Sequence, residues 1–178
     1  MTLFSTYLPA TRSTFLRYGA VLMLATMLAA CGFKPRGSNG QYRLPFHTIY
    51  LGFAETSPLG VELRRNLRGL DGIIVVDDAT KAEAKIDVVS ESRGKVILSL
   101  NSQGRVREYL LTYTLVFKVR DGKDGELLPP TEITLKRSIA FNENQTLAKE
   151  SEEVLLYRDM QSDLVQQILR RLTALKAQ

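Results

Sequence analysis

Apolar and polar residues alternate through the middle of the chain with the two-residue period that is typical of β-strands. The clearest run has an apolar residue at every second position: Tyr109, Leu111, Tyr113, Leu115, Phe117 and Val119. Shorter runs of the same kind predict strands near residues 47–53, 73–76, 84–100 and 131–141. Turn-forming residues at 101–104 and 121–125 predict hairpins between the three longest strands.

The strand at residues 84–100 is predicted to keep one apolar face along its whole length. That face holds Ile86, Val88, Val96, Leu98 and Leu100. Gly94 interrupts the run and could allow a bend or a bulge. In the last strand, Arg137 falls on the apolar face by the same alternation. Either a bulge turns this arginine outward, or the strand end is open to solvent there.

A different spacing of apolar residues predicts two helices. Ser57 and Pro58 form a typical helix start, and Gly69 follows as a stop signal. Between them, leucines recur every four residues: Leu59, Leu63 and Leu67. A longer helix is predicted at residues 146–175. Its apolar stripe consists of Tyr157, Met160, Leu164, Ile168, Leu172 and Leu175, and Leu147 and Val154 extend it backward.

These elements predict an α+β fold in the order β-α-β-β-β-β-α. We expect two helices packed on one face of a mostly antiparallel sheet of about four strands. The core should join the leucine stripes of the helices to the inner sheet face. Its predicted members are Leu63, Leu67, Tyr113, Leu115, Phe117, Ile133, Leu135, Leu164 and Ile168.

The N-terminal part has the organisation of an export signal. Arg12 and Arg17 precede an apolar run at residues 19–30, which is too short to span a bilayer as a helix. The run ends in Leu28-Ala29-Ala30-Cys31, which resembles the lipobox of bacterial lipoproteins, where the chain is cut before the cysteine and the cysteine is acylated. The alternative is an ordinary secretory signal, but Leu28 stands where such a site prefers a small residue.

Three segments follow from this reading. Residues 1–30 are the lipoprotein signal peptide, residues 31–45 are the acylated Cys31 with a flexible tether rich in glycine and proline, and residues 46–178 are a single α+β domain. Cleavage would remove two arginines and no acidic side chain, lowering the net charge from +5 to +3. Such a modest charge on an exported protein gives no indication of nucleic-acid binding.

The start of the mature chain carries a family resemblance. Residues 31–37, Cys-Gly-Phe-Lys-Pro-Arg-Gly, are similar to the mature start of the LptE family of lipopolysaccharide-assembly lipoproteins, although Pro35 replaces a leucine. Further shared features are Arg107-Glu108-Tyr109, Arg137-Ser138 and Leu147-Ala148-Lys149. The resemblance implies lipopolysaccharide (LPS) as ligand and a large LptD-type outer-membrane β-barrel as partner. It also implies an anchor of acyl chains on the periplasmic side of the outer membrane.

No catalytic or cofactor chemistry is indicated. The chain has one histidine and one cysteine, so we expect no transition-metal site, and no nucleophile or phosphate-loop motif occurs. We favour a non-enzymatic protein, and the family resemblance implies that it plugs and helps assemble the barrel and binds LPS during its insertion. The alternative is a lipoprotein that carries or shields a lipid in a cavity of its own, without a barrel partner.

Four basic residues are candidates for binding LPS, near the ends of the last two long strands. They are Lys136, Arg137, Arg105 and Arg107. Basic side chains recognise the phosphates of lipid A through charge-assisted hydrogen bonds. The competing interpretation for each of them is ordinary surface charge.

Overall fold

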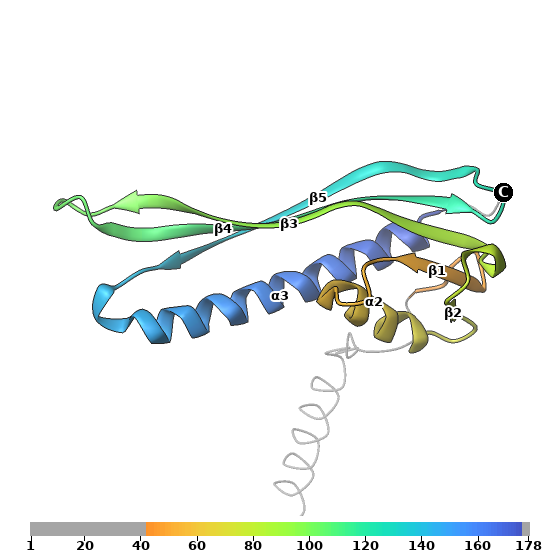
Figure 1. Ribbon diagram of the computed structural model, residues 1–178, viewed down its shortest axis with the longest axis horizontal. Helices are drawn as coiled ribbons and strands as arrows, with labels where there is room; N and C mark the ends of the chain where they lie inside the picture. Colours follow the sequence, from red (N-terminus) through yellow and green to blue (C-terminus); the bar gives the residue numbers. More distant parts are fainter. Residues whose placement is uncertain (1–41, 176–178) are drawn as a thin grey trace, which may run out of the picture. The chain divides into compact units, whose positions relative to one another are not determined.

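The protein folds into a mixed five-stranded sheet with two helices on one of its faces, as shown by a computed structural model (Figure 1). The structure describes residues 42–175, so the expected signal peptide, Cys31 and most of the expected tether lie outside the described residues. The elements in chain order are β1 (Thr48–Gly52), α2 (Pro58–Arg68), β2 (Ile74–Val76), a 3-10 turn (Ala79–Lys81), β3 (Ala84–Leu100), β4 (Val106–Asp121), β5 (Glu126–Ala140), a second 3-10 turn (Glu143–Gln145) and α3 (Thr146–Thr173).

The strand order in the sheet is β2-β1-β3-β4-β5. β1 pairs in parallel with β2 on one side and with β3 on the other, while β3, β4 and β5 form an antiparallel meander. The α+β class is confirmed. The sheet has five strands rather than about four, because the short β2 pairs with β1 as a full edge strand.

The first helix forms as its sequence predicts. Ser57 caps α2 by accepting a hydrogen bond from the backbone N–H of Gly60 (3.2 Å), and Pro58 occupies the first turn, where a missing N–H costs nothing. The leucine stripe at Leu59, Leu63 and Leu67 is fully buried against the sheet.

One extra residue in β3 changes which of its side chains face the helices. Val88 lies opposite Phe117 and Ser90 lies opposite Val116, so Val89 has no partner on β4 and forms a bulge. After the bulge the alternation is inverted. The predicted single apolar face from Ile86 to Leu100 is therefore wrong, and the irregularities lie at Val89 and beyond Ile97, where the register shifts twice more, rather than at Gly94.

The core is otherwise close to the prediction, since eight of the nine predicted residues are buried and Leu135 is half-buried. The backward extension of the α3 stripe is wrong, because Leu147 and Val154 are 81% and 60% exposed. Here α3 lies against a charged side chain of the sheet, Lys95, and forms an ion pair with it through Glu153 instead of an apolar contact.

β5 begins five residues before its predicted start at Thr131 and includes Pro129 and Pro130. An edge strand tolerates prolines because one row of its N–H groups needs no partner, and a register shift against β4 occurs in this region. From Ile133 to Ile139 the register is regular, so no bulge turns Arg137 outward. Arg137 stays on the helix side of the open edge.

Residues 42–45, which fall within the expected tether, already pack against the domain. Leu44 belongs to the core, and the Tyr42 hydroxyl donates a hydrogen bond to the Gln166 side chain (2.8 Å).

Candidate functional site

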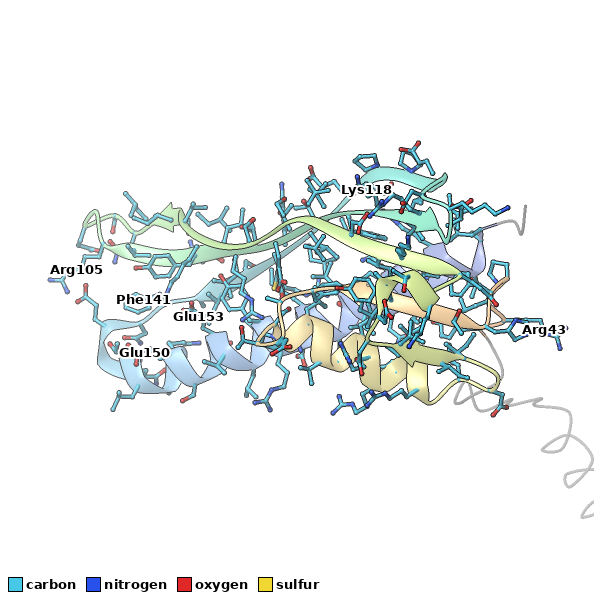
Figure 2. The ribbon with its side chains drawn as sticks, turned by 45° about the vertical axis from the view of Figure 1, so that its right-hand side comes forward. Arg43, Arg105, Lys118, Phe141, Glu150 and Glu153 are labelled. Atoms are coloured by element: carbon cyan, nitrogen blue, oxygen red, sulfur yellow. The ribbon has the colours of Figure 1, made fainter. Side chains whose placement is uncertain are left out.

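The two hairpin turns lie at opposite ends of β4, and we call the end with the turn at residues 101–104 the distal end. Figure 2 shows Arg105, Phe141, Glu150 and Glu153 at this end, with Arg43 and Lys118 toward the other end. Asn101 organises the turn by accepting hydrogen bonds from the backbone N–H groups of Gln103 (3.0 Å) and Arg105 (2.9 Å). Gly104 has φ +75°, which glycine adopts without strain.

Two of the predicted ligands, Arg105 and Arg107, lie at the distal end. Arg105 forms an exposed ion pair with Glu143 (3.0 Å), which links the turn to the segment that enters α3. Arg107 is exposed, and both arginines line an open cavity of about 250 Å³ that also involves Phe141. The cavity is small and polar, so it could hold an anionic group but not an acyl chain.

The other two predicted ligands lie on opposite faces of β5. Arg137 faces the helices and forms an ion pair with Asp163 of α3 (2.8 Å), which neutralises its charge. Lys136 faces away from the helices and is exposed; among residues 42–175 its ammonium group has no carboxylate partner. The structure thus does not gather the four candidates into one cluster, and of these four only Lys136 offers a free charge on the outer face.

The outer face of β3, β4 and β5, which no helix covers, is amphipathic. Cross-strand pairing puts Lys136 opposite Thr112, and the next row toward the distal end contains Val96, Leu110 and Ser138. Val96 is 57% exposed. An apolar patch therefore adjoins an unpaired cation with hydroxyl groups around it. Sequence reasoning missed this patch, because only the bulge at Val89 turns Val96 outward.

On the inner face, the same inversion creates a polar cluster between the sheet and both helices. The Tyr113 hydroxyl donates to the Glu91 carboxylate (2.6 Å), and the Arg93 guanidinium donates to the Tyr113 hydroxyl (3.1 Å) while lying 4.4 Å from its ring centroid. Arg93 also donates to Gln161 of α3 (3.2 Å), whose amide donates to Glu62 of α2 (2.6 Å). The cluster ties four elements together.

Burial and neighbouring polar groups raise the pKa values of two side chains in this layer. Desolvation first, and then the hydrogen bond to Glu91, raises the pKa of Tyr113 to about 12. Near the distal end, Lys95 donates to Glu153 (2.5 Å) and lies 4.4 Å from the Tyr109 ring centroid. That hydrogen bond is the main cause of a raised pKa for Lys95.

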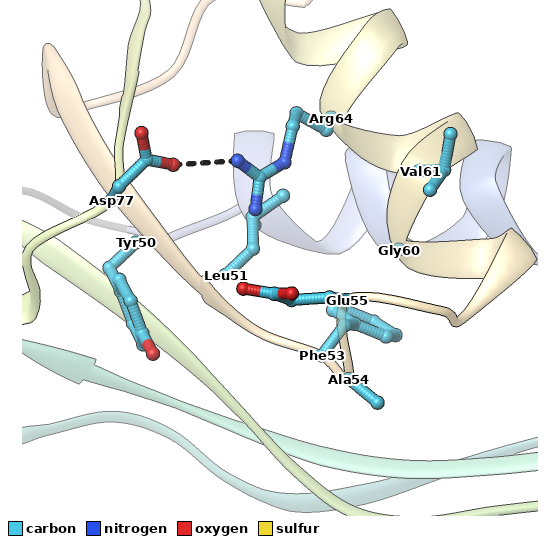
Figure 3. Close-up of a pocket in the computed structure, with 9 residues that line it drawn as sticks. All are labelled: Tyr50, Leu51, Phe53, Ala54, Glu55, Gly60, Val61, Arg64 and Asp77. Carbon is cyan, nitrogen blue, oxygen red and sulfur yellow. Dashed lines mark hydrogen bonds and ion pairs between the residues drawn. The ribbon is translucent and has the colours of Figure 1, made fainter.

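A further cavity of about 350 Å³ lies where β1 leads into α2, and Figure 3 shows its lining. Arg64 is bonded to Asp77 (2.7 Å), and the carboxylate of Glu55 lies nearby. With two carboxylates and one arginine that is already paired, this hollow disfavours phosphate. It is therefore a poor candidate for the predicted LPS site.

Within residues 42–175, neither helix has the length and apolar character needed to cross a membrane. The same part of the chain contains no group of three side chains that could hold a metal ion.

Comparison with known proteins identifies the family. A sequence profile of the family described as LptE, lipopolysaccharide-assembly, matches residues 46–172. The chain belongs to the LptE family. It is 32% identical over 155 residues to the LPS-assembly lipoprotein LptE of Pectobacterium atrosepticum, covering 85% of this chain and 82% of the relative. LptE of Yersinia pestis is 27% identical over 160 residues, covering 88% and 75%.

Solved structures share the fold of this LptE-family chain. An uncharacterized lipoprotein B from Nitrosomonas europaea, solved in solution, has a TM-score of 0.69 at 42% identity and covers 80% of this chain and 91% of its own. The rare lipoprotein B of Shewanella oneidensis has a TM-score of 0.62 at 27% identity, with 71% and 94% covered. The family resemblance seen in the sequence is thereby confirmed.

The polar inner layer predicts an alkaline limit of stability. The pKa values of Tyr113 and Lys95 are both higher in the folded chain than their ordinary values of 10.0 and 10.5. The unfolded chain then binds fewer protons, so stability is complete below pH 10 and falls as the pH rises toward 12. Denaturant unfolding at pH 9, 10, 11 and 11.5 should show this decline. In Tyr113→Phe the decline should be shallower by about one proton per molecule at pH 11. An unchanged slope in that variant would mean that Tyr113 is not the titrating group.

Proposed function

We propose that this protein is a non-enzymatic outer-membrane lipoprotein that binds LPS during its insertion into the outer leaflet. We also propose that it plugs an LptD-type LPS-transport β-barrel and helps that barrel assemble. In this proposal, acyl chains on Cys31 anchor it on the periplasmic side of the outer membrane. Membership of the LptE family and the names of its relatives support a role in LPS assembly.

The observation that carries LPS binding is the amphipathic outer face of the sheet. LPS combines phosphate groups with acyl chains, and the outer face combines the unpaired cation of Lys136 with the neighbouring apolar residues Val96 and Leu110. Thr112 lies opposite Lys136 on the same face and adds a hydroxyl group, while the neighbouring Thr134 hydroxyl donates to Glu132 (2.7 Å). A phosphate at Lys136 would leave an acyl chain free to follow the apolar residues toward the distal end.

The carrier alternative is less well supported by the cavities. The two cavities described above have volumes of about 350 and 250 Å³, and a third of about 190 Å³ lies between the start of α3 and the distal parts of β3, β4 and β5. Charged residues line each of them. Pockets that enclose a lipid-sized ligand are larger and mainly apolar. Cavities of this size favour binding of the lipid on an exposed face, shared with a partner, over its enclosure in an internal cavity.

The proposed position inside a barrel agrees with the polarity of the surface. A barrel lumen is polar, and most exposed side chains of the sheet and of α3 are polar or charged. The hairpin turns at residues 101–104 and 121–125 lie at the two ends of the long β4, so one end could face the outer leaflet while the other faces the periplasm.

For the binding site, Lys136→Asp should weaken LPS binding by about tenfold, which corresponds to about 1.4 kcal/mol. The substitution places a negative charge beside the ligand phosphate. The affinity of the unaltered protein should also fall with added salt, because screening weakens an exposed charge pair. Both effects can be measured with immobilised purified LPS.

Lys118→Asp is the matched control, because Lys118 lies on the same sheet face but toward the opposite end. This substitution should leave LPS binding unchanged. Arg137→Asp should have a smaller effect than Lys136→Asp, because Asp163 already neutralises Arg137. Equal affinity for Lys136→Asp and the unaltered protein would place the LPS site elsewhere.

For the plug, purification of the acylated protein in detergent should retain a β-barrel protein of several times its mass. Photocrosslinkers at Ser102 and Lys123, in the two opposite turns, should both attach to that barrel in cells. If neither position crosslinks while both proteins are present, the chain does not sit inside the barrel.

A further inference from the structure

The distal half of β3 has an open edge. β1 pairs with β3 from Ala84 to Asp87 only, and β4 occupies the opposite side of β3 along its length. From Val89 to Leu100, no strand among residues 42–175 pairs with β3 on the side where β1 ends. Its backbone groups on that side are therefore available for another strand.

The open edge is regular enough to accept one. The register against β4 is unbroken from Ser90 to Ile97. The Tyr157 hydroxyl donates to the Gly94 carbonyl (2.7 Å), which indicates that this carbonyl points away from β4. Backbone direction repeats every two residues in an antiparallel strand, so the backbone groups of Ser92 and Val96 point the same way. The Gly94 carbonyl is bound by Tyr157, and the backbone groups of Ser92 and Val96 remain available to an added strand.

The other long edge of the sheet is more strongly protected than this one, which is regular between the bulge at Val89 and the register shifts beyond Ile97. Natural edge strands avoid pairing by carrying prolines and charges, and β5 has both, in Pro129, Pro130 and Lys136. The distal part of β3 instead exposes apolar side chains. They are Val96, Ile97, Leu98 and Leu100.

Most of the charges that the distal part of β3 carries have polar partners within the fold. Lys95 is paired with Glu153, and the Glu91 carboxylate accepts the Tyr113 hydroxyl hydrogen bond. Arg93 has no carboxylate partner among residues 42–175, but its guanidinium lies over the Tyr113 ring and donates to Gln161. A strand added at this edge would meet Val96 on one face and Ile97 on the other, so a complementary segment is itself apolar at alternate positions.

We propose that the β3 edge from Ser92 to Ile97 docks one extended segment of the barrel protein, apolar at alternate positions, by β-strand addition, an inference that rests on the proposed function. Open backbone N–H and C=O groups require a polypeptide partner, since acyl chains offer no hydrogen bonds. The wall strands of a closed barrel already pair with one another, so the docked segment is a loop or a terminal segment of the barrel protein that enters the lumen.

Hydrogen exchange of the full-length acylated protein, free and bound to the barrel protein, tests the pairing. The amides of Ser92, Gly94 and Val96 should exchange quickly in the free protein and at least about tenfold more slowly in the complex. If the complex forms but these amides exchange as in the free protein, the strand-addition inference is wrong and the plug proposal stands. If no complex forms, both are wrong.

A charge at the edge gives an independent test. Ile97 is 56% exposed on the helix side of the edge, so Ile97→Lys should leave thermal unfolding and LPS binding unchanged. It should reduce retention of the barrel protein by about tenfold, because the added charge would be buried against the docked segment. The matched control is Leu147→Lys, an exposed apolar residue on α3 away from this edge, which should retain the barrel fully.

Two results would contradict the inference. Retention that is equal for Ile97→Lys and Leu147→Lys would show that the edge is not in contact with the barrel protein. Slow exchange of the edge amides in the isolated protein, together with the mass of a dimer, would show that a second copy of the chain occupies the edge instead.

Discussion

The unpaired residue Val89 in β3 is the constraint on which the functional part of this fold depends. Because side chains alternate with a strict period of two, one extra residue exchanges the two faces of the strand until the next register shift, which follows Ile97. Before the bulge, Ala84 and Ile86 enter the core. Beyond it, Arg93 and Lys95 lie under the sheet with α3, and Val96 lies outside. The amphipathic outer face and the polar inner layer both follow from that exchange.

The polar inner layer explains how α3 can be longer than the core that it covers. Charged side chains that face another layer of a fold need polar partners there, and Arg93 and Lys95 meet Gln161 and Glu153, which lie about two turns apart on α3. The helix is thus held by apolar packing in its second half and by polar contacts in its first half. Its remaining apolar residues there, such as Leu147, are left exposed.

Several elements could be predicted from the sequence because their signals are local. The Ser57 cap, the leucines of α2 and the alternating apolar residues of β4 each specify one conformation with little competition. The errors lie where tertiary contacts decide. A bulge cannot be recognised from the sequence when the extra residue is a valine in a segment rich in strand-forming residues. The prolines of β5 hid the start of that strand, because strands tolerate proline mainly at a sheet edge. For the same reason Lys136 and Arg137, which are neighbours in the sequence, could not be separated in role until their partners were known.

Deletion of single residues from β3 tests the bulge most directly. Removing Val89 should preserve every downstream side-chain orientation, because Ser90 would then follow Val88 in regular alternation. The bulge therefore predicts a loss of no more than about 1–2 kcal/mol in the free energy of unfolding. Removing Gly94 should cost clearly more, because residues 95–97 would exchange faces and Lys95 would lose Glu153. If the two deletions were equally damaging in denaturant unfolding, β3 would not carry its bulge at Val89, and the faces assigned to its distal half would be wrong.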